Sequence, residues 1–156
     1  MDKLYTAEQK TKKMNNKIIK LFLRISISFG FLSAVADRFG LCREEISTWG
    51  NWENFLNFTK LINPWFPESV IPAIATIATG AEIVFAVFLL LGFKTELFAK
   101  LSGVLLLLFA LSMTFSIGLK SAFDYSVFVA SAAAFALSLM KEKYIELDTL
   151  IFKSKN

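Results

Sequence analysis

The chain has 156 residues, of which 55% are hydrophobic and 19% are charged, and its formal net charge at pH 7 is +4. Soluble domains are about 45–50% apolar and about 25% charged, so this composition argues against an ordinary soluble domain and favours an integral membrane protein. Histidine is absent and Cys42 is the only cysteine, which excludes an internal disulfide, a thiol-relay pair and the commonest ligand of haem and zinc. We therefore expect no metal site, and any redox cofactor should be organic or belong to a partner protein.

Four apolar windows account for the excess of hydrophobic residues. They cover residues 18–36, 70–93, 97–119 and 122–140. Each is close to the roughly 20 residues that a helix needs to cross the bilayer core, and backbone groups in lipid must be paired internally, which favours helices. We therefore predict an all-α fold, an integral membrane four-helix bundle. Residues 18–140 would form the four-span domain, between a polar basic tail at residues 1–17 and a second tail at residues 141–156.

Basic residues are distributed unevenly around these predicted spans. Most lysines precede the first span, link the second to the third, or follow the fourth, whereas the opposite loops hold only Arg38, Arg43, Lys60 and Lys120. Cytoplasmic loops retain Lys and Arg, so we expect both termini in the cytoplasm and a multi-pass protein of the bacterial inner membrane. The positive charge then reflects topology, and no nucleic-acid partner is expected. The Lys-rich residues 1–16 should be disordered or lie on the membrane surface.

The first apolar window has a second interpretation. Basic residues, an apolar stretch and then "SAVAD" resemble a secretory signal with a cleavage site at Ala34-Val35-Ala36. A retained first helix is favoured, because Arg24 interrupts an apolar stretch that a signal peptide would keep uncharged.

The loop between the first two spans is predicted to hold a short helix. Within "STWGNWENFLNFTKLINPWFPES", apolar residues follow helical spacing, Asn51 suits the capping position, and Asn63-Pro64 would end the helix. Because Trp favours the lipid–water boundary, we expect a helix lying flat on the outer membrane surface. A lid packed over the bundle would have the same pattern, and the two arrangements are compatible. The expected interfacial anchors are the three tryptophans of the chain, Trp49, Trp52 and Trp65.

Turn signals mark the ends of the later spans. Pro72 suits the first turn of the second span, where amide hydrogens have no helical partner, and Gly92 would end that span. The links "FKTE" and "GLKSAFD" are short, so the second, third and fourth spans are expected to be antiparallel neighbours.

Two charged residues lie deep inside predicted spans. Glu82 interrupts the apolar run "TGAEIVFAVFLLLGF", and Arg24 is the only cation that lies more than four residues inside a span. Charges at membrane depth are costly and normally pair inside the bundle. Counting the 1.5 Å rise per residue from the cytoplasmic end puts Arg24 about 6 Å below Glu82, so we predict that the two meet between the first and second spans. The pair would either lock two helices together or mark a ligand or proton path.

Other polar residues extend these two hypotheses. Ser26, Gly30, Ser33 and Asp37 recur at helical spacing on the first span, which is typical of a lined interior. A second polar cluster is predicted at the outer rim, where it could admit a polar head group. Its members are Asp37, Arg38, Lys120 and Asp124.

Several stretches resemble the DoxX family of small four-helix membrane proteins. They are "RISISFGFLSAVADRFG", "WGNWENFLNFTKLINPWFP", "IATGAEIVFAVFLLLGFKTELFAKLSG" and "DYSVF", and the resemblance runs from Leu21 to Met140. It implies a four-helix membrane fold. Named members of that family are linked to quinone-coupled oxidation of sulfur compounds, as subunits associated with a membrane quinone oxidoreductase. By position the resemblance carries over Arg24, Glu82 and Asn63-Pro64, and it supplies no catalytic residue.

Three functions are compatible with the sequence. The chain could be an accessory subunit that binds a quinone or a similar small amphiphile for a membrane redox partner, rather than a complete enzyme. It could instead be a permeation element for small solutes, gated by Arg24 and Glu82, or a membrane scaffold. The oligomeric state is not predicted.

Overall fold

The computed structural model describes the backbone of residues 2–152 and the side chains of residues 8–149. Within this part of the chain it contains helices and loops but no strand, which confirms the all-α prediction. Three helices, within residues 8–38, 68–91 and 95–116, are long and apolar enough to cross a membrane. Large apolar side chains face outwards on these helices, among them Phe22, Ile77 and Phe115, which are 67%, 72% and 76% exposed. These features indicate a membrane protein.

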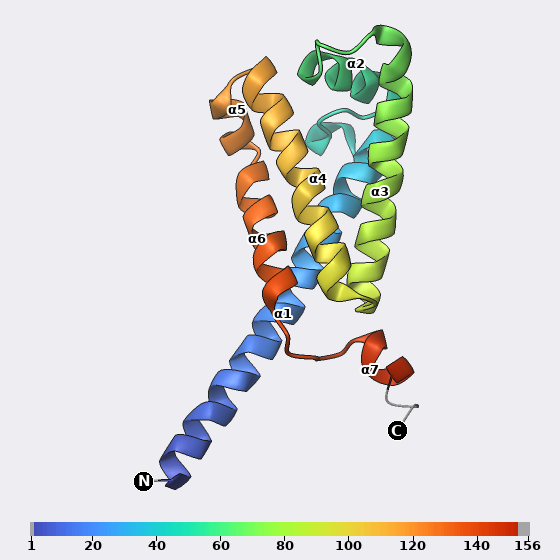
Figure 1. The fold of residues 1–156 in the computed structure, drawn as a ribbon. Coiled ribbons are helices and arrows are strands. Elements are labelled where there is room, and N and C mark those ends of the chain that lie inside the picture. Colours follow the sequence, from blue (N-terminus) through green and yellow to red (C-terminus); the bar gives the residue numbers. More distant parts are fainter. Residues whose placement is uncertain (1, 153–156) are drawn as a thin grey trace.

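The main helices run alternately up and down in Figure 1. Helix α1 (Asp2–Arg38) rises, α3 (Ile71–Leu91) descends, α4 (Thr95–Ser116) rises and α6 (Val127–Leu139) descends. Helix α1 packs mainly on α3, and α4 packs mainly on α6. The beginning of α1 and the short α7 (Leu147–Phe152) therefore both lie at the lower end of the bundle.

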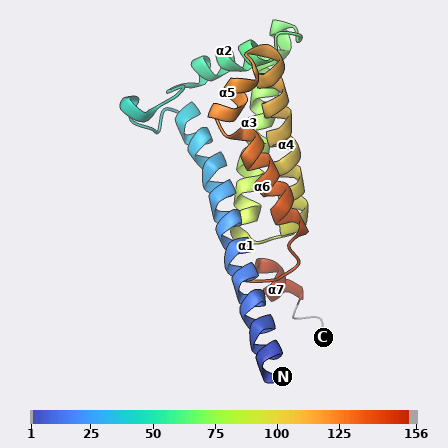
Figure 2. The same cartoon turned by 90° about the vertical axis from the view of Figure 1, so that its left-hand side faces the viewer.

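Helix α2 (Trp52–Ile62) lies across the upper end of the bundle (Figures 1 and 2). As predicted, the side chain of Asn51 caps it by accepting the amide of Asn54 at 2.8 Å, and the helix ends before Asn63-Pro64. Helix α2 packs on α3 and α4. It buries Phe55, Thr59 and Ile62, so it forms a lid, while its position on a membrane surface stays a prediction.

The ends of α3 also agree with the turn signals. Pro72 lies in the first turn of α3, preceded by a single 3-10 turn (Glu68–Val70). Gly92 ends the helix with φ of 67°, in the left-handed region that glycine adopts without strain. The next helix begins three residues later at Thr95, which makes α3 and α4 antiparallel neighbours.

Helix α1 begins well before the predicted first span. Residues 1–16 were expected to be disordered or to lie on the membrane surface. Residues 2–16 continue α1 without a break, so the expectation of disorder is wrong for them, while a position on the membrane surface stays a prediction. The segment contains no Gly or Pro, and it has four Lys together with single Ala, Leu, Met, Gln and Glu residues, all of which are good helix formers. Extending an existing helix also needs no new nucleus.

The fourth apolar window is not one helix, contrary to the prediction. Helix α5 (Leu119–Asp124) ends early and α6 begins only at Val127. Between them, Ser126 has φ of 55°, and this left-handed conformation breaks a helix. With 13 residues, α6 is shorter than the roughly 20 residues that a helix needs to cross the bilayer core.

Candidate functional site

Glu82 forms a buried ion pair with Arg38 between α1 and α3. Glu82 in the middle of α3 is 2% exposed, and Arg38 at the end of α1 is 3% exposed. Nη1 of Arg38 donates to Oε2 of Glu82 and to Oγ1 of Thr79, the latter at 2.8 Å, and Nη2 donates to Oε1 of Glu82 at 3.0 Å. This two-point contact matches the fixed fork of a guanidinium to a carboxylate, and it gives the mid-helix charge a partner.

The predicted pairing of Arg24 with Glu82 is therefore wrong. Helical side chains tilt towards the N-terminus of their own helix. In α1 that direction is downwards in Figure 1, so Arg24 points away from Glu82 while Arg38 reaches back down towards it. In α3 the same tilt carries Glu82 upwards to Arg38. The level of each residue along its helix was considered in the prediction, but the direction of its side chain was not.

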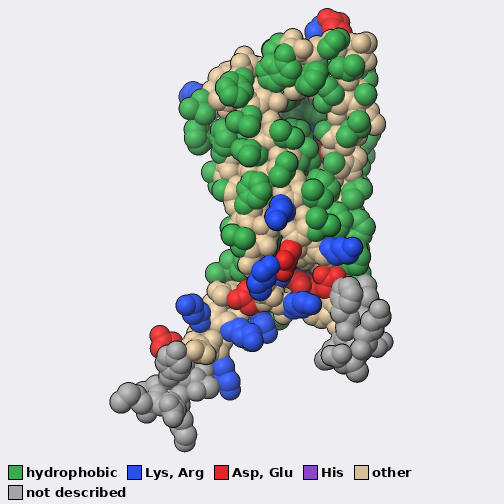
Figure 3. Space-filling view, in the orientation of Figure 1, with side chains coloured by type: hydrophobic (Ala, Val, Ile, Leu, Met, Phe, Trp, Pro, Cys, Tyr) green, Lys and Arg blue, Asp and Glu red, His purple; other side chains and the backbone are tan. Residues whose placement is uncertain are grey.

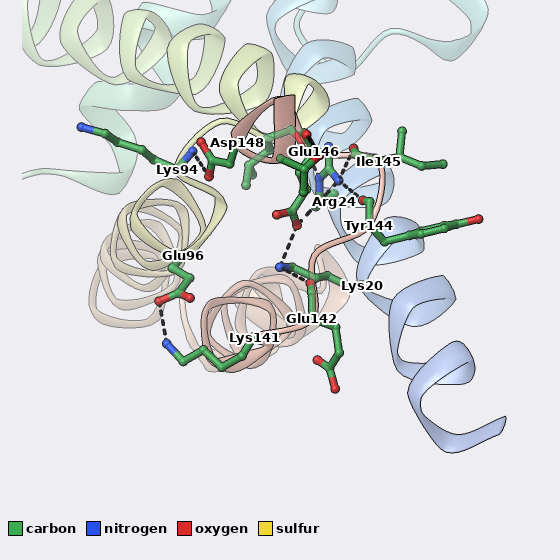
Figure 4. A network of polar contacts seen from close by, with 12 residues as sticks. Lys20, Arg24, Lys94, Glu96, Lys141, Glu142, Tyr144, Ile145, Glu146 and Asp148 are labelled. Atoms are coloured by element: carbon green, nitrogen blue, oxygen red, sulfur yellow. Dashed lines mark hydrogen bonds and ion pairs between the residues drawn. The ribbon is translucent and has the colours of Figure 1, made fainter. Parts of the chain in front are cut away.

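Arg24 instead holds together three segments at the lower end of the bundle (Figure 4). Its side chain is 1% exposed, and Nε and Nη2 donate to the carbonyls of Leu89 and Leu90 at 2.8 and 3.0 Å. Nη1 donates to the carbonyls of Tyr144 and Ile145 at 3.1 and 2.9 Å. The last carbonyls of α3 carry the negative end of its dipole, so a buried cation is stabilised there, although Leu89 also accepts the amide of Gly92.

Residues 141–149 continue this contact as a segment that we call the C-terminal strap. Lys20 pairs with Glu146 at 2.7 Å and donates to the carbonyl of Glu142 at 2.7 Å. Asn16 donates to the carboxylate of Glu142 at 2.7 Å, and this hydrogen bond lowers the pKa of Glu142 below its ordinary value. The amide of Lys94 donates to Asp148 at 2.9 Å. The strap thus binds both α1 and the turn before α4, and Arg24 is an architectural residue.

The predicted outer-rim cluster is also not formed. Asp37 is 6% exposed and accepts hydrogen bonds from the hydroxyl of Ser47 and from the amides of Thr48 and Trp49, the amides at 3.0 and 2.8 Å. Arg38 turns into the bundle. Lys120 and Asp124 pair with each other at 2.6 Å on an exposed face of α5. Neighbouring positions in sequence at the end of a helix point in different directions, so the four charges separate.

The guanidinium of Arg38 lies beneath an aromatic cover. Its central carbon is 3.9 Å from the ring centroid of Phe55 and 5.3 Å from that of Trp49, which are cation–π distances. Asp37 fixes Trp49 there through the backbone of the loop. Two buried donors, Nε of Arg38 and Nε1 of Trp49, meet no acceptor among the described residues. Buried N–H groups are nearly always paired, so this end of the site has unused donors.

A cavity of about 940 Å³ extends from the Arg38–Glu82 pair between the helices. Helices α1, α2, α3, α4 and α6 all contribute to its wall, which is mostly apolar and aromatic. Figure 3 shows a hollow between α3 and α4 below α2, in a surface that is largely apolar above the charged lower end. Ligand pockets combine such apolar walls with a few convergent polar groups, and this volume is sufficient for a small organic ligand.

A second polar group lies in the cavity wall below α2. Asn63 donates to the carbonyl of Thr59 at 2.9 Å and accepts from the hydroxyl of Ser112 at 3.1 Å. Asn63, Thr59 and Ser112 all line the cavity. The wall therefore holds two separate polar groups, the Arg38–Glu82 pair and Asn63. Asn63 is the residue that precedes Pro64.

The sequence had predicted some of these contributors but not their arrangement. Trp49 and Trp65 line the cavity, and Trp52 stacks on Phe39 at 5.9 Å between ring centroids. The role of all three as interfacial anchors stays a prediction. Arg38 was assigned to the rim because it follows the apolar window. The signal that could have placed it inside is the tilt of a helical side chain towards the N-terminus of its helix, which carries Arg38 back towards the level of Glu82.

Comparisons of the chain with models of protein families, with curated proteins and with solved structures find no match. The site must therefore be interpreted from its own chemistry. Among the side chains of residues 8–149, no group of three or more Asp, Glu or Cys residues could hold a metal ion. The cavity wall combines a neutralised charge pair with a large apolar surface, and this arrangement suits an amphiphile.

Proposed function

We propose that this protein is a four-span, DoxX-like protein of the bacterial inner membrane that binds a small amphiphile in the cavity beside Arg38 and Glu82. The proposed ligand has a flat, apolar body and oxygen atoms that accept hydrogen bonds, and a quinone is the leading candidate. The protein would act as an accessory subunit that holds this molecule for a redox partner in the membrane. α5 and α6 together would complete the fourth span.

The observation that carries this proposal is a large, mostly apolar cavity bordered by Arg38 and Trp49, each of which has a buried donor nitrogen without an acceptor among the described residues. A buried N–H group without an acceptor costs about 1–3 kcal/mol, and a ligand carbonyl that met it after a small movement of the side chain would remove that cost. Glu82 already neutralises Arg38, so a neutral acceptor fits better than a carboxylate. The aromatic rings of Phe55 and Trp49 would contact a flat ligand. The mostly apolar wall gives a polar solute few partners, which argues against the permeation hypothesis.

Fluorescence quenching of single tryptophans tests this proposal. The test protein keeps Trp49, with Trp52→Phe and Trp65→Phe, and the control keeps Trp52 alone. Because Trp49 lines the cavity and Trp52 stacks on Phe39, a benzoquinone added to nanodiscs should half-quench Trp49 at a mole fraction about tenfold lower, equivalent to about 1.4 kcal/mol. Identical quenching curves for the two proteins would show only partition into the bilayer and would contradict the proposal.

The proposed topology gives an independent expected result. Reporter proteins fused after residue 156 and inserted within residues 43–48 should report opposite sides of the membrane, with the first in the cytoplasm. The reason is the excess of lysine at the lower end of the bundle and the positive-inside rule. Reports from the same side would contradict the four-span arrangement and would make signal cleavage at Ala34-Val35-Ala36 the leading alternative.

A further inference from the structure

The lining of the cavity reaches exposed residues on both α1 and α6, among them Gly30 and Val129. In Figure 1 the two helices lie further apart towards α2 than at the lower end of α6. Each packs mainly on another helix, α1 on α3 and α6 on α4. The cavity lining continues into this gap from both sides, through Ser26, Gly30 and Ala34 of α1 and Ala130 and Ala133 of α6.

Small side chains leave this gap open. Ser26 and Gly30 line the cavity and are also exposed at the surface of the bundle. A Cβ atom built on Gly30 would meet nothing within 4 Å, so the neighbouring helix does not fill the space. Val129 on the opposite edge is 63% exposed and lines the same cavity. The gap faces outwards from a helix that is apolar enough to cross a membrane, so lipid chains would surround it.

We infer that the ligand has a hydrocarbon tail, which leaves the bundle between α1 and α6 while its head group lies against Arg38. This inference rests on the proposed function, and it specifies an amphiphile that reaches the site from the bilayer rather than from water. The small residues alone would not indicate a ligand. The independent observation is Arg38, which is 3% exposed, lines the same continuous cavity and has an unused Nε donor.

A second opening, between α3 and α4, suits a tail less well. Its edges carry Ile77, Leu108 and Phe115, which line the cavity and are 72%, 56% and 76% exposed. These long side chains narrow that opening, whereas most of the lining along the α1–α6 gap is short, namely Ser26, Gly30, Ala34, Ala130 and Ala133. The tail is therefore assigned to the α1–α6 gap.

Two quinones and a matched pair of glycine variants test the inference. The probes are a dimethoxy-methyl-benzoquinone without a tail and the same ring with a decyl chain, both added to nanodiscs that hold the protein with Trp49 as its only tryptophan. Affinities are expressed as mole fractions in the bilayer, which removes differences in partition. Gly30→Phe fills the gap. Gly80→Phe is the control, because Gly80 is also helical and exposed, has open space around its Cβ and does not line the cavity.

The decyl quinone should bind about tenfold more tightly than the tailless ring. Gly30→Phe should abolish this difference while the tailless ring still binds, and Gly80→Phe should preserve it. Ala130→Phe fills the gap from α6 and replaces the first variant if that one does not fold.

The possible contrary results are distinguishable. Equal affinities of the two probes for the single-tryptophan protein without a gap substitution would overturn the inference that the ligand has a tail. The proposed function would stay in place. A tail advantage that survives Gly30→Phe and Ala130→Phe would also overturn the inference, because the tail would then leave elsewhere. Failure of both probes to quench Trp49 more strongly than Trp52 would contradict the proposed function itself, and the inference with it.

Discussion

Replacing Glu82 with glutamine should lower the free energy of unfolding by about 3–5 kcal/mol, because it leaves Arg38 buried without its partner. The carboxylate accepts from both terminal nitrogens of Arg38, and neither side chain is more than 4% exposed. Thermal and denaturant unfolding in detergent would measure the loss. The matched control is Glu68→Gln, which removes a surface pair whose side chains are 54% and 77% exposed. That change should cost about 0–1 kcal/mol.

A double-mutant cycle assigns the partner of Glu82. Combining Arg38→Gln with Glu82→Gln should cost clearly less than the sum of the single changes, because residues in direct contact are coupled by about 0.5–3 kcal/mol. Arg24→Gln with Glu82→Gln should instead be additive, since Arg24 binds the carbonyls at the other end of α3. If the effects on the free energy of unfolding were additive for Arg38 and Glu82 but coupled for Arg24 and Glu82, Arg24 would be the partner of Glu82. That result would contradict the structure.

Replacing Arg24 with lysine should have the second large effect. Lysine keeps the charge but loses the planar fork of donors, and Arg24 uses three nitrogens to bind carbonyls on α3 and on the strap. Hydrogen bonds to charged groups contribute about 1.5–3 kcal/mol each, so a net loss of about 3 kcal/mol is expected. The strap should also detach, which makes the peptide bond after Lys143 accessible to trypsin.

The control for this prediction is Lys141→Gln. Lys141 pairs with Glu96 at 2.6 Å, but the two side chains are 72% and 53% exposed, so its loss should change neither the melting temperature nor cleavage after Lys143 appreciably. If Arg24→Lys is as stable and as protease-resistant as this control, Arg24 does not hold the strap.

Helix ends were predictable because their signals are local. The cap by Asn51, the stop at Asn63-Pro64 and the left-handed Gly92 each depend on a few neighbouring residues, and the structure confirms all three. The break at Ser126 was missed, because neither Gly nor Pro marks it. A serine rarely adopts the left-handed region, so a sequence pattern does not predict it there.

The candidate site was predicted in its components but not in its pairing. Glu82 was correctly expected to face a cation inside the bundle, because a lone mid-helix charge requires one. Choosing between Arg24 and Arg38 required the relative height of α1 and α3 and the direction of each side chain. The strap adds a competing set of carbonyls for Arg24, and it comes from residues that were expected only to form a tail.

An architectural role for the Arg38–Glu82 pair competes with a role in binding. A buried ion pair is often no more stable than apolar residues of similar volume, so stability alone does not explain its presence. The pair also borders a cavity of about 940 Å³ and leaves Nε of Arg38 without an acceptor among the described residues. A scaffold would not require either feature, whereas a binding site requires both.

The most direct test is the mass of whatever the purified protein retains from a quinone-containing membrane. Extraction and mass spectrometry should recover a tailed, carbonyl-bearing amphiphile at about one molecule per protein. This occupancy is expected when the ligand concentration in the membrane is many times the dissociation constant of the site. Ala78→Phe, which projects a ring into the cavity from α3, should deplete it, and Gly80→Phe on the outer face should not. Recovery of only bulk phospholipid, in equal amounts from all three proteins, would contradict a ligand site beside Arg38 and Glu82.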